Sequence, residues 1–84
     1  MQAKKDRNKI ETGSDNPNPP TRTQIKRGDA VWVIEKENYG TTDYTQGFVQ
    51  DILTSKEFHP RGIKVRLSDG TVGRVQWLMK DYRL

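Results

Sequence analysis

The sequence predicts an all-β protein, a small SH3-like barrel of four to five antiparallel strands that follows a disordered N-terminal tail. β-Branched and aromatic residues concentrate in four short runs between residues 30 and 76, and turn residues such as Gly and Asp separate these runs. No segment has the apolar spacing of a convincing helix. A strongly bent antiparallel sheet closes on itself, which buries one face and hides its edges. An OB-like barrel is the alternative architecture.

The composition indicates one small domain. The chain has 84 residues, of which 31% are apolar and 31% are charged, so it is too short for a second independent core. Residues 1–25 hold few apolar side chains among Lys, Asn, Asp, Thr and Pro. Such a basic, proline-containing segment buries too little apolar surface to offset the entropy of ordering it. We therefore expect a disordered tail over residues 1–25 and the barrel domain over residues 26–84.

The first two strands are expected on either side of a polar loop. Residues 30–35 are rich in β-branched and aromatic side chains and follow a Gly-Asp turn signal. Residues 45–53 resume strand character after the loop. Gly47 lies inside this second run, where a glycine indicates a bulge or a strong bend.

The last two strands are expected to form a hairpin. Residues 63–67 alternate apolar and basic side chains, and residues 72–76 return as their partner after the hairpin signal Asp69-Gly70. A two-residue turn would place Arg74 opposite Val65, whereas a longer turn shifts the pairing by one residue. Trp77 and the two residues after it are expected to fold back over one end of the core.

A basic outer face on this hairpin is the main candidate binding site. Lys64 and Arg66 alternate with apolar neighbours and therefore point away from the core, and the turn length decides whether Arg74 joins them. A row of cations suits a phosphate backbone. The residues expected to contact nucleic acid are His59, Arg61, Lys64, Arg66, Arg74 and Gln76. The alternative is a solvated hairpin whose cations pair with Asp51, Glu35 or Asp69.

The aromatic residues divide between core and surface. Phe48 and Trp77 are expected in the core of so small a domain. Aromatic side chains in loops can stack on unpaired bases or can instead cover the open end of the barrel. The candidates for stacking are Tyr39, Tyr44 and Phe58.

His59 is the only histidine, and no serine or carboxylate has a spacing that identifies a catalytic partner for it. We expect it to anchor a loop by hydrogen bonding, while Arg61 and Gly62 present a guanidinium and backbone N–H groups to an anion. One histidine with dispersed carboxylates also indicates no metal site, and the absence of cysteine removes disulfides and thiolate chemistry. We therefore expect neither enzyme activity nor a cofactor.

No apolar run approaches the roughly 20 residues that cross a bilayer, and the N-terminus lacks the apolar core of a secretory signal. We expect no membrane association, a monomer, and a cytoplasmic location, with a nuclear or organellar one left open.

Three strings in the second half of the chain resemble a known family. These are GFVQDILT at 47–54, HPRGIKVRL at 59–67 and DGTVGRVQ at 69–76, and they resemble the YwbE family of small uncharacterised proteins over about residues 27–77. The segment from residue 26 through Val49 more loosely resembles the KOW-type barrels of ribosomal and transcription-elongation proteins. That resemblance implies an SH3-like barrel that contacts RNA or a partner protein.

The sequence thus predicts a binding module for RNA or another nucleic acid, including single strands, through the basic hairpin. The alternative is a protein-interaction module, in which an exposed strand edge or the groove beside Trp32 and Tyr44 takes up a peptide.

Overall fold

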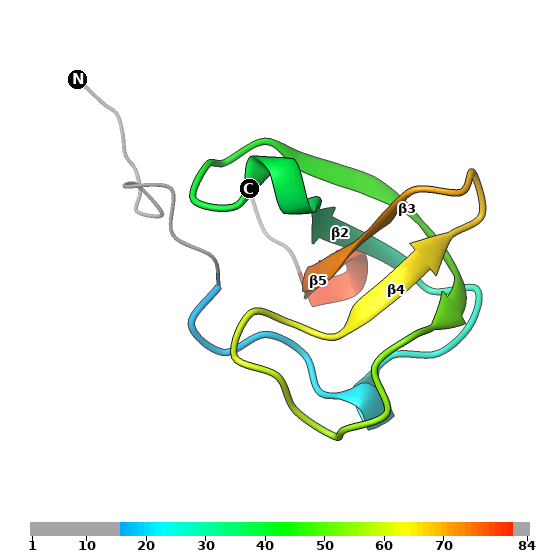
Figure 1. Cartoon of the computed structure of the whole chain (residues 1–84). Coiled ribbons are helices and arrows are strands. Elements are labelled where there is room, and N and C mark those ends of the chain that lie inside the picture. Colours follow the sequence, from blue (N-terminus) through cyan, green and yellow to red (C-terminus); the bar gives the residue numbers. More distant parts are fainter. Residues whose placement is uncertain (1–15, 82–84) are drawn as a thin grey trace.

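The structure, a computed structural model, describes residues 16–81 and forms a closed barrel of four antiparallel strands (Figure 1). The strands are β2 (Ala30–Ile34), β3 (Tyr44–Ile52), β4 (Lys64–Leu67) and β5 (Val72–Leu78). Each pairs with the next in the chain, and β5 closes the barrel by pairing with β2. This confirms the predicted all-β fold class, a small SH3-like barrel.

Short 3₁₀ turns connect and flank the strands. They are η2 (Arg22–Gln24), η3 (Lys36–Asn38) and η4 (Met79–Asp81). The fold-back expected at Trp77 and the two residues after it begins only at Met79, the first residue of η4, because Trp77 and Leu78 continue β5. No helix within residues 16–81 is long and apolar enough to cross a membrane.

The core lies inside the barrel and is built mainly from alternate strand residues, together with Ile25 and Ile63, which precede β2 and β4. Because successive side chains of a strand point to opposite faces, one apolar set per strand faces inward and the other residues face solvent. The buried apolar side chains are Ile25, Val31, Val33, Ile34, Val49, Ile63, Val65, Leu67, Val75 and Leu78. This inward set leaves the basic residues of β4 and β5 on the outer face.

The β4–β5 hairpin turns over three residues rather than two. Leu67 N–H donates to the Thr71 carbonyl oxygen at 2.7 Å, and Gly70 adopts a φ of 94°. Lys64 consequently pairs with Arg74, which is the longer-turn alternative. Residues directly opposite in an antiparallel pair share a face. Arg74 therefore joins Lys64 on the outer face.

The irregularity expected at Gly47 lies elsewhere in β3. The register of β2 with β3 runs unbroken past Gly47, which lies opposite Val31. A Cβ added to Gly47 would lie 2.7 Å from Cδ1 of Leu67, so this glycine makes room for that side chain. The register shifts instead between Val49 and Asp51, which makes Gln50 the extra residue of a bulge.

The expectation that Phe48 lies in the core is wrong. Its neighbours Gly47 and Val49 face inward, so Phe48 points outward and is 53% exposed. Trp77 is half-buried rather than in the core, and its ring packs edge-on against Tyr44 with centroids 5.1 Å apart.

The predicted disorder of the N-terminal segment is wrong for residues 16–25, which pack along the loop that precedes β4 (Figure 1). Arg22 N–H donates to the Glu57 carbonyl oxygen at 2.8 Å, and Arg22 Nε donates to the Thr54 carbonyl oxygen at 3.0 Å. Ile25 is only 3% exposed and joins the core. The ordered domain therefore begins before residue 26. Residues 1–15 lie outside the described residues, so their disorder stays a prediction.

Candidate nucleic-acid interface

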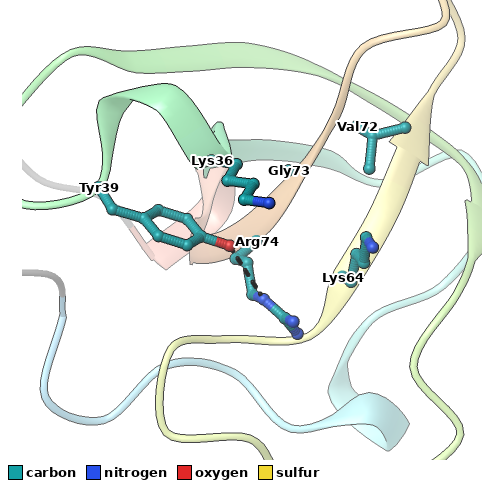
Figure 2. A pocket seen from close by; sticks show the side chains of 6 residues that line it. All are labelled: Lys36, Tyr39, Lys64, Val72, Gly73 and Arg74. Atoms are coloured by element: carbon teal, nitrogen blue, oxygen red, sulfur yellow. Dashed lines mark hydrogen bonds between the residues drawn. The ribbon is translucent and has the colours of Figure 1, made fainter.

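The outer face of the hairpin forms one wall of a basic pocket of about 270 Å³ (Figure 2). The opposite wall comes from η3 and the residue that follows it. The pocket is lined by Lys36, Tyr39, Lys64, Val72, Gly73 and Arg74. Three of these side chains are cationic and none is acidic, so the pocket has the charge that an anionic ligand requires.

Arg74 is held in the pocket by two hydrogen bonds, of which Figure 2 shows the one to Tyr39. Its Nε donates to the phenol oxygen of Tyr39 at 3.3 Å, and its Nη1 donates to the Gly62 carbonyl oxygen at 3.2 Å. The side chain is also half-buried. Because the guanidinium is already oriented, less side-chain entropy is lost when it binds a ligand.

Tyr39 contacts a second arginine. The guanidinium carbon of Arg61 lies 4.7 Å from the centroid of the Tyr39 ring, which is a cation–π contact. One face of the ring is therefore covered. The structure thus gives Tyr39 a role in orienting Arg61 and Arg74, whereas stacking on a base was the role predicted for it.

His59 organises the loop that carries Arg61. Its Nδ1 accepts a hydrogen bond from Arg61 N–H at 3.0 Å, and its carbonyl oxygen accepts one from Gly62 N–H at 2.9 Å. This confirms the prediction of a loop-anchoring histidine. Partial burial, followed by the positive charges of Arg74, Lys56 and Arg61, lowers the pKa of His59 below its ordinary value of 6.5. The neutral ring leaves Nδ1 free of a proton and able to accept the hydrogen bond.

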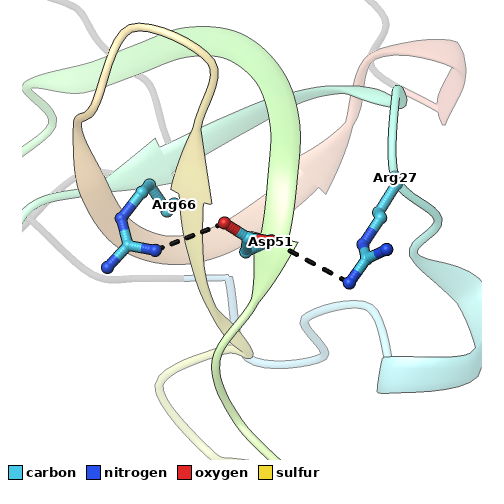
Figure 3. Close-up of polar contacts among 3 residues, drawn as sticks. All are labelled: Arg27, Asp51 and Arg66. Atoms are coloured by element: carbon cyan, nitrogen blue, oxygen red, sulfur yellow. Dashed lines mark hydrogen bonds and ion pairs between the residues drawn. The ribbon is translucent and has the colours of Figure 1, made fainter.

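Arg66 lies outside this pocket and is paired with a carboxylate (Figure 3). Its Nη1 lies 3.3 Å from Asp51 Oδ2, and Arg27 lies 3.9 Å from the other oxygen of the same group. The pairing with Asp51 that the sequence offered as an alternative therefore holds for Arg66. These side chains are partly exposed, and such pairs contribute about 0–1 kcal/mol.

The prediction that Gln76 contacts nucleic acid is wrong, because its side chain is fully buried. Its Nε2 donates to the Arg61 carbonyl oxygen at 2.7 Å, and its Oε1 accepts from Asn16 N–H at 2.8 Å. The register of β2 with β5 shifts between Trp32 and Val33, which pair with Trp77 and Val75, so the shift lies opposite Gln76. Such an irregularity breaks the alternation of faces, so Gln76 turns inward beside Val75.

The other predicted stacking residues differ in exposure. Tyr44 is the first residue of β3 and is half-buried against Trp77. Phe58 is 48% exposed in the loop before His59. No group of three or more His, Cys, Asp or Glu within residues 16–81 is placed to hold a metal ion.

Comparison with known proteins places the chain in a family. A family model described as "Uncharacterized conserved protein (DUF2196)" matches residues 18–78. The chain belongs to this family. "Uncharacterized protein YwbE" of Bacillus subtilis (strain 168) is 45% identical over 62 residues, which are 74% of this chain and 95% of that protein. The resemblance to the YwbE family is thereby confirmed.

The part of the chain that matches the DUF2196 model contains all six residues that line the basic pocket. The family description names no activity. No solved structure matches the chain significantly, and the resemblance of this DUF2196 domain to KOW-type barrels stays a prediction.

The sequence did not predict three of the lining residues, Lys36, Val72 and Gly73, and Lys36 is the only cation among them. Lys36 lies in a polar stretch without a motif, and only the tertiary structure brings η3 to the β4–β5 hairpin.

Proposed function

We propose that this DUF2196 domain is a binding module for RNA rather than an enzyme, and that its basic pocket holds RNA phosphates. The observation that carries the proposal is the convergence of Lys36, Lys64 and Arg74 on one pocket with no lining carboxylate. Contacts between cationic side chains and phosphates supply most of the affinity of sequence-independent nucleic-acid binding.

The three cations, Lys36, Lys64 and Arg74, have no carboxylate partner within residues 16–80, which supports this proposal. A phosphate therefore does not have to displace a carboxylate from them. Arg66 differs, because a phosphate would compete with Asp51 for its guanidinium.

An exposed aromatic side chain in the loop before β4 favours single-stranded RNA as the ligand. Phe58 is exposed and directly precedes His59, whose ring accepts the Arg61 N–H. An exposed aromatic ring stacks on unpaired bases, which a duplex does not offer. The loop before β4 thus supplies an aromatic surface in the same segment as a cation.

Fluorescence anisotropy of labelled single-stranded RNA and duplex DNA, measured with the full chain at two salt concentrations, tests the proposal. The informative variant is Lys36→Glu/Lys64→Glu. The matched control is Lys26→Glu/Lys80→Glu, which changes exposed lysines outside the pocket. Each double variant lowers the formal net charge from +4 by four, to zero.

We expect RNA binding that weakens as salt rises, and an affinity for the pocket variant at least about tenfold below that of the control. Equal losses in both variants would show that net charge rather than the pocket governs binding. No RNA binding at low salt would refute the proposal.

Exposed apolar side chains favour a protein-interaction module as the second candidate. Phe48, Leu53 and Phe58 are 53%, 41% and 48% exposed. A partner recovered on the immobilised chain after nuclease treatment, and lost in Phe48→Gln, would support this function. Recovery that disappears with nuclease would count against it.

A further inference from the structure

The charge of the pocket exceeds what one phosphodiester neutralises. Lys36, Lys64 and Arg74 each contribute one positive charge, and no lining residue is acidic. A phosphodiester carries one negative charge, whereas a phosphate monoester carries about 1.5 to 2 at pH 7. The monoester therefore gains more electrostatic free energy in this pocket.

The hydrogen-bond donors of the pocket also outnumber the acceptors of a diester. The Nε and Nη1 of Arg74 donate hydrogen bonds to protein oxygens, whereas its Nη2 has no acceptor within residues 16–80. Lys36 and Lys64 add two ammonium groups, which donate only. Three separate cationic groups match the three terminal oxygens of a monoester, whereas a diester has two such oxygens.

The size of the pocket favours a small group. Its volume of about 270 Å³ lies just below the range of roughly 300–1,000 Å³ that is typical of sites for drug-sized ligands. The pocket thus has room for a phosphate and part of its sugar, with the rest of a strand outside. A strand end enters such a pocket more easily than a chain that continues in both directions.

We infer that the pocket is selective for a phosphate monoester on a nucleotide, carried at the end of an RNA strand or on a free mononucleotide. This inference rests on the proposed function and specifies the group that the same pocket recognises. Lys36 and Lys64 supply the charge that distinguishes the monoester from the diester, and Arg74 supplies the oriented donor.

The test compares one single-stranded RNA with a 5′-phosphate, with a 3′-phosphate or with hydroxyls at both ends, using the full chain. We expect a phosphorylated end to bind at least about tenfold more tightly than the hydroxyl ends. The preference should disappear in Lys36→Gln/Lys64→Gln and persist in Lys26→Gln/Lys80→Gln. Both variants lower the formal net charge from +4 by two, to +2.

Competition with AMP and with adenosine distinguishes the two sources of the monoester. Displacement of labelled RNA by AMP but not by adenosine supports recognition of a free nucleotide. Displacement by phosphorylated RNA alone supports recognition of a strand end. Equal affinity for phosphorylated and hydroxyl ends would overturn the inference while leaving RNA binding intact. Binding of AMP without binding of any RNA would support the monoester site and refute the proposed function.

Discussion

Lys64 and Arg74 lie directly opposite each other in the β4–β5 ladder, and their side chains leave the barrel on the same outer face (Figure 2). Like charges at directly opposed positions destabilise a sheet. Arg74 is also tied to Tyr39 and Gly62, so its guanidinium has a fixed place beside the hairpin. A bound phosphate would offset the repulsion between the two groups, so the unfavourable pair is consistent with a role in binding rather than in stability.

Replacing Lys64 should separate the effect of the like-charge pair on stability from its effect on RNA binding. Lys64→Gln removes the like-charge pair, and we expect the free energy of unfolding to rise by up to about 0.5 kcal/mol while RNA binding weakens. Urea denaturation and anisotropy on the same preparation measure the two quantities. A variant that loses stability would show that Lys64 packs favourably and that the repulsion is negligible.

The pKa of His59 should report on occupancy of the pocket. The folded pKa lies below the ordinary 6.5, so the unfolded chain binds the proton more readily. The contribution of His59 to stability is therefore present above the unfolded pKa near 6.5 and is lost as pH falls through the folded pKa. A phosphate near Arg74 offsets one of the charges that lower this pKa, so we expect RNA to raise it. NMR titration of the ring, with and without RNA, measures the change.

His59→Asn is the matched control for this titration. An asparagine side chain can accept the N–H of the residue two positions on, as Nδ1 of His59 accepts that of Arg61, but it does not titrate. The pH dependence of binding between about pH 5 and 7.5 should flatten in this variant when the RNA carries hydroxyl ends, because a terminal phosphate monoester would itself titrate at about pH 6. An unchanged His59 pKa on RNA binding would place the phosphate away from Arg74.

The buried amide of Gln76 should contribute to stability. Gln76→Leu leaves the Asn16 N–H and the Arg61 carbonyl oxygen without their present partner. We expect the free energy of unfolding to fall by about 2 kcal/mol. The control Gln50→Leu changes an exposed glutamine and should stay within about 0.5 kcal/mol of the wild type. Equal urea midpoints for both variants would show that Gln76 contributes nothing.

Two glycines with positive φ should respond differently to alanine. At Gly62, with φ 105°, an added Cβ would collide with the Val75 carbonyl oxygen, whereas at Gly70, with φ 94°, no atom lies within 4 Å. We expect Gly70→Ala to cost about 1 kcal/mol from backbone strain alone and Gly62→Ala at least about 3 kcal/mol. Thermal unfolding measures which variant loses more stability. A smaller loss in Gly62→Ala than in Gly70→Ala would mean that the 59–62 loop adapts to the added Cβ.

The hairpin was predictable because its signals are local. Asp69-Gly70 and the alternation before it identify both strands and place Lys64 outside. The sequence does not decide which residues of the two strands lie opposite each other, because this depends on whether the turn has two or three residues. The positive φ of Gly70 within a three-residue turn sets this in the structure.

The remaining features depend on contacts between distant residues. Gln76 is buried because of an irregularity where β5 meets β2, and that pairing has no local signal. Asn16 reaches Gln76 across 60 positions of sequence, which is why composition alone predicted disorder there. Lys36 enters the pocket only through closure of the barrel.

NMR mapping of backbone amide shifts during titration with 5′-phosphorylated single-stranded RNA would locate the binding surface on the full chain. If the basic pocket holds RNA phosphates, the largest shifts fall at residues 36–39, 61–64 and 72–74 and vanish in Lys36→Glu/Lys64→Glu. Largest shifts around residues 29–30 and 78–80, which line a separate pocket, or no shifts at low salt, would contradict this assignment.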